Sequence, residues 1–199
     1  MELLQPDWNQ PKPEFLDVKK LLASAEIRPL EIKSPILGEF LARLRRNHAN
    51  GGAYLFCFEV GPSSVYDWYT SRNRWSFDGI IDTLLEHPAF LSQLKEIDAT
   101  APIASGLQQE SSFLLDGRFA ALLHLGGAYT QAQGDGREEK QFAIKVCEEM
   151  FGLRYGEITC NMSGAVWTPW FYGIAWDLTI MIFDKRLRRV WLFVITDTD

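Results

Sequence analysis

The carboxylates and large aromatic residues near the carboxyl terminus are the side chains whose types and spacing could do chemistry. Asp177 precedes one apolar segment, and Asp197 and Asp199 follow a second one. The aromatic residues before the first segment are Trp167, Trp170, Phe171 and Trp176. Carboxylate oxygens are good ligands for hard cations, and Trp is enriched where proteins bind one another. The pattern therefore indicates a protein-binding surface or, alternatively, a carboxylate site.

Two apolar segments, 178–183 and 190–195, must position these residues. Both are rich in β-branched and aromatic side chains, which favour strands, and the charged segment 184–189 between them predicts a hairpin turn. Alternate residues point to opposite faces of a strand, and here both faces are apolar. We therefore expect the hairpin to lie centrally in a sheet that is covered on both sides.

The register of this hairpin decides whether the acidic groups meet. Pairing Phe183 with Val190 would place Asp177 opposite Thr196, with Asp197 and Asp199 close by at the same end. A tighter turn would shift the register by two residues and keep the same faces. The hairpin therefore predicts carboxylates gathered beneath the aromatic segment.

The rest of the chain predicts helices mixed with a few strands. The expected helices lie near 15–25, 35–50, 78–85, 88–97, 117–125 and 136–151, and the other expected strands near 53–60, 65–70 and 155–160. Asp116-Gly117 could instead form a hairpin turn, but the Ala and Leu residues that follow favour the helix. This order predicts an α+β fold: a mainly antiparallel sheet, including the C-terminal hairpin at about 177–196, with helices packed on it.

Domain organisation follows from composition along the chain. Residues 1–13 carry three prolines among polar residues and predict an extended arm, and residues 14–199 predict a single α+β domain. Small and polar residues dominate 98–112, which is the one plausible subdomain break.

Charge and composition exclude several classes of protein. The net charge is −6 and neither half of the chain is a basic module, so we expect no nucleic-acid partner. The first residues lack the features of a signal peptide and no apolar run of 18 residues occurs, so we expect a cytoplasmic protein without a membrane partner. Cys57, Cys147 and Cys160 lie far apart in apolar contexts, which predicts buried, reduced thiols and no zinc site.

No motif assigns a catalytic residue, a metal ligand or a cofactor. His48 lies one turn after Leu44 on the apolar face of a predicted helix, which is typical of a hydrogen-bonded residue at the edge of a core. His124 also lies beside apolar positions. Whether the chain is an enzyme stays open, and the absence of a motif favours a protein that is not one.

The main hypothesis is a non-catalytic, protein-binding module, such as an inhibitor or immunity-like protein, that uses an acidic and aromatic surface. The alternative is a small enzyme with a carboxylate site near Asp177, metal-assisted and with His124 as base. A homodimer that buries the aromatic segment is a third alternative. A purely structural role is also open, in which the tryptophans seal the core and Asp177 binds loop amides.

Overall fold

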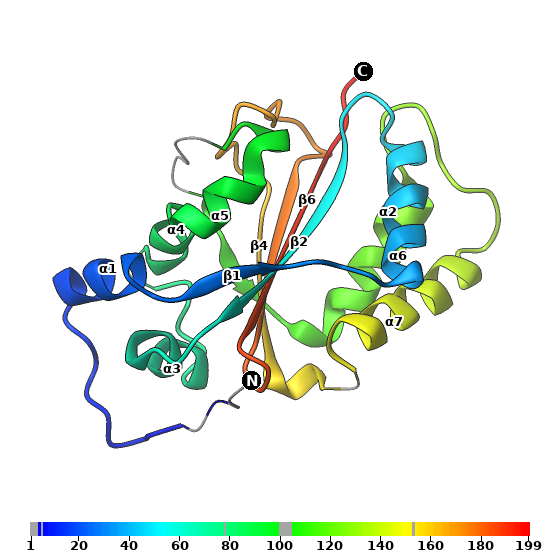
Figure 1. Ribbon diagram of the computed structural model, residues 1–199. Coiled ribbons are helices and arrows are strands. Elements are labelled where there is room, and N and C mark those ends of the chain that lie inside the picture. The colour runs from blue at the N-terminus through cyan, green and yellow to red at the C-terminus, as the bar shows by residue number, and fades with distance from the viewer. Residues whose placement is uncertain (1–3, 5, 78, 100–104, 153) are drawn as a thin grey trace.

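A six-stranded antiparallel sheet forms the centre of the computed structural model, which describes residues 4 and 6–199 apart from 78, 100–104 and 153 (Figure 1). The strands follow the order β1-β2-β6-β5-β4-β3 across the sheet. Their bounds are Ile27–Leu30 for β1, Gly52–Val60 for β2, Gln108–Glu110 for β3, Ile158–Ser163 for β4, Leu178–Asp184 for β5 and Arg189–Thr196 for β6. Helices pack against the sheet, so the fold is α+β.

The C-terminal hairpin is confirmed in its register and its central position. Phe183 pairs with Val190 and Leu178 pairs with Ile195, while β2 flanks β6 and β4 flanks β5. From Ile180 to Phe183 and from Val190 to Ile195, every side chain of the two strands is buried. Each large apolar side chain contributes about 1.5–3 kcal/mol when it leaves water, so this hairpin stabilises both cores of the molecule.

Helices cover both faces of the sheet and divide the core in two. One face packs against α1 (Phe15–Ala23), α3 (Ser64–Ser71), α4 (Ile80–Leu85) and α5 (Pro88–Gln93), which is followed by a short 3-10 helix. The other face packs against α2 (Pro35–Asn47), α6 (Leu115–Leu125) and α7 (Arg137–Phe151). The two helical layers lie on opposite sides of the sheet in Figure 1. This arrangement explains why both faces of the hairpin are apolar.

The predicted strand at 65–70 is wrong, because these residues form helix α3. The hydroxyl of Ser63 accepts a hydrogen bond from the amide of Tyr66, which caps the helix at its start. Strand β2 therefore forms no hairpin with the residues that follow it, and pairs instead with β1 and β6. The aromatic residues Trp68 and Tyr69 favour a strand by composition, but they are buried here from a helix.

Most of the other predicted elements are present, and two edge strands were missed. The helix over 117–125 is α6, so the alternative hairpin turn is wrong, and Ser34 caps α2 as expected. The missed strands are β1 and β3, the latter lying in the polar segment 98–112 and pairing with β4. Of that segment, residues 100–104 lie outside the described residues, as does the predicted helix cap Asp78.

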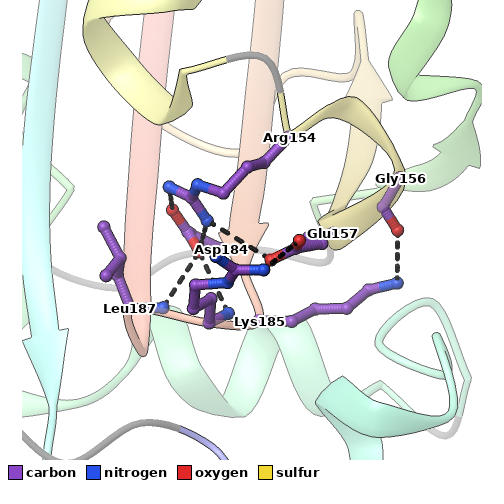
Figure 2. Close-up of polar contacts among 7 residues, drawn as sticks. Arg154, Gly156, Glu157, Asp184, Lys185 and Leu187 are labelled. Atoms are coloured by element: carbon purple, nitrogen blue, oxygen red, sulfur yellow. Dashed lines mark hydrogen bonds and ion pairs between the residues drawn. The ribbon is translucent and has the colours of Figure 1, made fainter.

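Arginines close the turn between β5 and β6, which we call the turn end of the sheet. Asp184 is fully buried, and its two oxygens accept hydrogen bonds from both terminal nitrogens of Arg154 at 2.8 and 2.6 Å (Figure 2). The amides of Arg186 and Leu187 also donate to Asp184. The paired carboxylate raises the pKa of Arg154, so this guanidinium stays charged at neutral pH.

Candidate functional site

Asp177 anchors the aromatic segment at the opposite end of the hairpin, which we call the open end. It is 4 % exposed, and its Oδ1 accepts a hydrogen bond from the hydroxyl of Thr196. Its Oδ2 accepts hydrogen bonds from the amides of Gly173 and Ile174 at 2.6 and 3.1 Å. The predicted meeting of Asp177 with Thr196 is therefore present, and the carboxylate ties the loop to β6.

Asp197 plays a similar part for two other loops at the open end. It is 1 % exposed, and its two oxygens accept hydrogen bonds from the amides of Asn50 at 3.0 Å and Ala128 at 2.8 Å. A Cβ atom on Gly127 would lie 2.0 Å from Oδ2 of Asp197, so only glycine allows this close approach. Asp199, by contrast, is exposed.

The predicted aromatic set is divided between the two faces of the sheet. Trp167 and Phe171 are buried in the core beneath α1, α3, α4 and α5, and Nε1 of Trp167 donates to the hydroxyl of Thr179 at 2.7 Å. Trp170 is half-buried and packs edge-on against Tyr54 at 5.5 Å between ring centres. Trp176 is half-buried too, but it lines a cleft that includes residues of α6. Trp167 therefore seals a core, and Trp176 is placed to meet a ligand.

This cleft has a volume of about 570 Å³, which lies within the usual range for ligand sites. One wall comes from α6 and the loop that follows it, and the other from residues 175–178. Its lining residues are His48, Arg118, Ala121, Leu122, Leu125, Gly126, Gly127, Ala128, Gln131, Ala175, Trp176, Asp177 and Leu178. The sequence placed Trp176 and Asp177 together, but it gave no sign that α6 would form the facing wall.

His48 is a buried residue of this lining that leaves one polar atom unpaired. It follows α2 directly, is 1 % exposed, and its Nδ1 lies 3.0 Å from the carbonyl oxygen of Leu44. A carbonyl only accepts, so Nδ1 carries the proton. Nε2 has no hydrogen-bond partner among the described residues. The prediction of a hydrogen-bonded residue at the edge of a core is confirmed for one nitrogen of the ring only.

Burial keeps this imidazole neutral. Loss of water around the ring lowers the pKa of His48, while its hydrogen bond to Leu44 and the charge of Asp197 oppose the shift. Nε2 is therefore an acceptor with a free lone pair. A buried polar atom without a partner costs about 1–3 kcal/mol, so this nitrogen lowers the stability of the fold.

Exposed apolar side chains surround the open end. Leu125 lies on the cleft wall with 62 % of its surface exposed, and Tyr129, four residues further on, is 71 % exposed. Val166 and Tyr172 are 43 % and 54 % exposed on the segment that Asp177 anchors. We call these four residues the apolar rim. Leu125 lines the cleft itself, and exposed apolar side chains of this size are typical of a surface that binds another molecule.

The alternative carboxylate site finds little geometric support. The oxygens of Asp177 already accept hydrogen bonds from two loop amides and a hydroxyl. Nδ1 of His124 lies 3.8 Å from Oε2 of Glu139 on α7, and His124 does not line the cleft. Among the residues that the structure describes, no group of three or more His, Cys, Asp or Glu side chains could hold a metal ion.

The cysteines are not candidates for chemistry either. Cys57, Cys147 and Cys160 are buried and unpaired, as the sequence predicted, and burial raises the pKa of each thiol to about 12. A thiol with so high a pKa is a poor nucleophile at neutral pH.

Comparisons with known proteins add no relative to this picture. The chain matches no protein-family model, no curated protein and no solved structure. In the described part of the chain, every helix is too short or too polar to cross a bilayer. Any function must therefore be argued from the geometry of the open end.

Proposed function

We propose that this chain is a non-catalytic protein-binding module of the cytoplasm, and that its partner docks over the open end of the sheet. The observation that carries the proposal is the apolar rim beside the cleft of about 570 Å³. Large exposed apolar side chains around a cavity suit a partner that inserts one side chain and covers the rest.

The rigidity of this surface supports the proposal. Asp177 and Asp197 hold the loops on either side of the cleft through buried hydrogen bonds to backbone amides. A surface that is already ordered loses little conformational entropy on binding, which favours affinity. Asp177 and Asp197 are buried, so they hold the contact surface in place and do not touch the partner. Of the three aspartates that the sequence predicted for this surface, Asp199 is the exposed one.

Charge favours a basic partner. The net charge of −6 attracts positively charged proteins over a distance and raises the association rate, while the contact itself is mainly apolar. An inhibitor or immunity-like protein that binds a basic enzyme has this combination of properties.

The test is site-specific crosslinking followed by affinity measurement. The photoreactive residue p-benzoylphenylalanine replaces Tyr129 of the rim in cells that make the protein, and the crosslinked product is identified by mass spectrometry. Binding of the purified partner is then measured for the unmodified protein and for Leu125→Asp. We expect Leu125→Asp to weaken binding at least about tenfold, because a charge would be buried in the contact.

Ile144→Asp is the matched control, because Ile144 is an exposed apolar residue on the outer side of α7. Its affinity should equal that of the unmodified protein. Equal affinities for Leu125→Asp and Ile144→Asp would refute the docking surface. A crosslink between two copies of this chain, with a dimer mass in light scattering, would favour the homodimer instead.

A further inference from the structure

The cleft at the open end has a lining that changes in character along α6. Arg118, Leu122 and Leu125 all belong to this lining, and they follow one another at intervals of four and three residues. Residues at this spacing lie on one face of a helix. With a rise of about 1.5 Å per residue, Arg118 and Leu125 lie about 10 Å apart along the helix axis. The helix therefore gives the cleft a basic end and an apolar end.

The two buried aspartates lie at the apolar end of the cleft. Asp197 accepts a hydrogen bond from the amide of Ala128, in the loop that follows α6, and Asp177 accepts one from the hydroxyl of Thr196. Thr196 directly precedes Asp197, so both carboxylates lie near the C-terminal end of α6. Arg118 lies in the first half of that helix, and positive and negative charge are thus separated along the cleft.

Arg118 keeps its donors available to a ligand. It is exposed, and among the residues with a described position it has no hydrogen bond and no ion pair. Its positive charge opposes the rise in the pKa of the Cys160 thiol that burial causes, and the charge of Glu110 adds to that rise. Arg118 therefore lies within electrostatic range of strand β4, with Glu110 as an acidic neighbour but not as an ion-pair partner.

We propose that the cleft binds a small organic acid, whose carboxylate pairs with Arg118 and whose apolar or aromatic body lies against Leu122, Leu125 and Trp176. A guanidinium presents parallel N–H groups that match the two oxygens of a carboxylate. The volume of about 570 Å³ suits a ligand of this class. This inference goes beyond the proposed function, because the acid binds the protein without its partner and would compete with the side chain that the partner inserts.

The other polar residues of the lining do not select for a negative charge. His48 is buried and neutral, and the amide of Gln131 is uncharged and can both donate and accept hydrogen bonds. Asp177 is 4 % exposed and its oxygens already accept hydrogen bonds, so its charge disfavours a carboxylate at the apolar end only. Arg118 therefore sets both the charge of the ligand and its orientation.

The experiment compares three ligands that share one phenylpropyl body and differ in charge at neutral pH. The probes are 3-phenylpropionate, which is negative, 3-phenylpropanamide, which is neutral, and 3-phenylpropylamine, which is positive. The whole protein carries ¹⁵N-labelled tryptophan, and its seven tryptophans should give seven indole N–H signals in NMR spectra. The signal that is absent from Trp176→Phe belongs to Trp176, and the other six signals are internal controls.

We expect 3-phenylpropionate to shift the Trp176 signal saturably, with a dissociation constant of about millimolar, and to bind at least about threefold more tightly than the amide. The amine should bind most weakly. Arg118→Gln should bring the acid and the amide to equal affinity, whereas Arg118→Lys should keep part of the preference. Arg137→Gln is the matched control, because it removes the charge of an exposed arginine on α7 that does not line the cleft.

Equal affinities for the acid and the amide, or a Trp176 signal that does not shift, would overturn the inference. It would also fail if Arg137→Gln lost the preference as Arg118→Gln does, because the net charge alone would then explain the selectivity. Melting temperatures of all variants are measured alongside. Comparison of the three probes on the unmodified protein tests the inference even if Arg118→Gln fails to fold.

Discussion

The two ends of the C-terminal hairpin each hold a buried aspartate, and they differ in what those aspartates bind. At the turn end, Asp184 is fully buried and meets both terminal nitrogens of Arg154, and neighbouring arginines pair with Glu157 and Asp67. At the open end, Asp177 and Asp197 bind neutral amides and a hydroxyl. Charged side chains line the clefts of the first end, which have volumes of about 220 and 480 Å³, whereas the second end has an unpaired imidazole nitrogen and a cleft with several apolar lining residues.

This difference shows that a buried carboxylate by itself does not mark a functional site. Both kinds of aspartate order their loops by accepting hydrogen bonds from backbone amides. Nε of Arg188 and Nε of Arg189 are unpaired at the turn end too, so what distinguishes the open end is an unpaired atom on an uncharged ring that belongs to the lining of the cleft. The buried carboxylates of the open end already have their hydrogen-bond partners, so the unpaired nitrogen of His48 asks for an explanation that the acidic residues around it do not.

The turn end should show the largest effect, because one member of a buried charge pair can be removed there. Asp184→Ala leaves Arg154 facing a cavity, with Glu157 at 3.8 Å as its remaining counter-charge, and we expect a loss of about 3–5 kcal/mol in the free energy of unfolding. Urea denaturation at pH 7 gives the value.

Glu157→Ala is the matched control at the turn end, because its ion pair with Arg186 is about half exposed and its other partner, Arg154, keeps the shorter pair with Asp184. That change should cost at most about 1 kcal/mol. Similar losses for Asp184→Ala and Glu157→Ala would contradict the view that burial makes the pair at Asp184 important.

The open end should respond less to the equivalent change. Asp197→Ala removes the acceptor for the amides of Asn50 and Ala128, and we expect a loss of about 1–3 kcal/mol, because the two donors are neutral. The same urea experiment measures it, with the exposed Asp199→Ala as control, expected within about 0.5 kcal/mol. A loss for Asp197→Ala larger than that for Asp184→Ala would reverse the comparison of the two ends.

The smallest effect should come from the protonation of His48. The pKa of His48 is lowered in the folded state, so the unfolded chain takes up the proton first as the pH falls. The associated stability is fully present above the ordinary histidine pKa of about 6.5, and it decreases as the pH falls from there toward the folded-state pKa.

His48→Asn removes this contribution and keeps the other titrating groups, including His87, whose pKa is also lowered by burial. Urea denaturation of both proteins between pH 8 and pH 5 should therefore show the steeper loss of stability for the original protein. Parallel curves for the two proteins would mean that His48 is not kept neutral by burial.

Much of the fold could be predicted because its signals are local in the sequence. The hairpin of β5 and β6 has strand-forming residues with apolar side chains on both faces, which predict its central position but leave open a register shift by two residues; the structure has the pairing of Phe183 with Val190. Ser34 before Pro35 fixes the start of α2 in the same way. Where local signals conflicted, prediction failed: aromatic residues favoured a strand at 65–70, but the cap at Ser63 and burial against the sheet favoured α3.

The candidate site was only half predictable for a related reason. Trp176 and Asp177 are neighbours in the chain, and the hairpin alone brings Asp177 to Thr196. The facing wall of the cleft comes from α6, and its lining also includes His48, which directly follows α2. Contacts between residues so far apart in the chain follow from how the helices pack, and no pattern of spacing encodes them.

The sequence by itself determined the hairpin, its burial and the position of the carboxylates at one end of it, because strand pairing and alternation follow from side chains a few residues apart. The tertiary structure alone decided that Trp167 is buried while Trp176 lines a cleft, and that Nε2 of His48 lacks a partner there. Which face of the sheet receives a side chain, and which polar atom remains unpaired, depend on the packing of α2, α6 and the strands together.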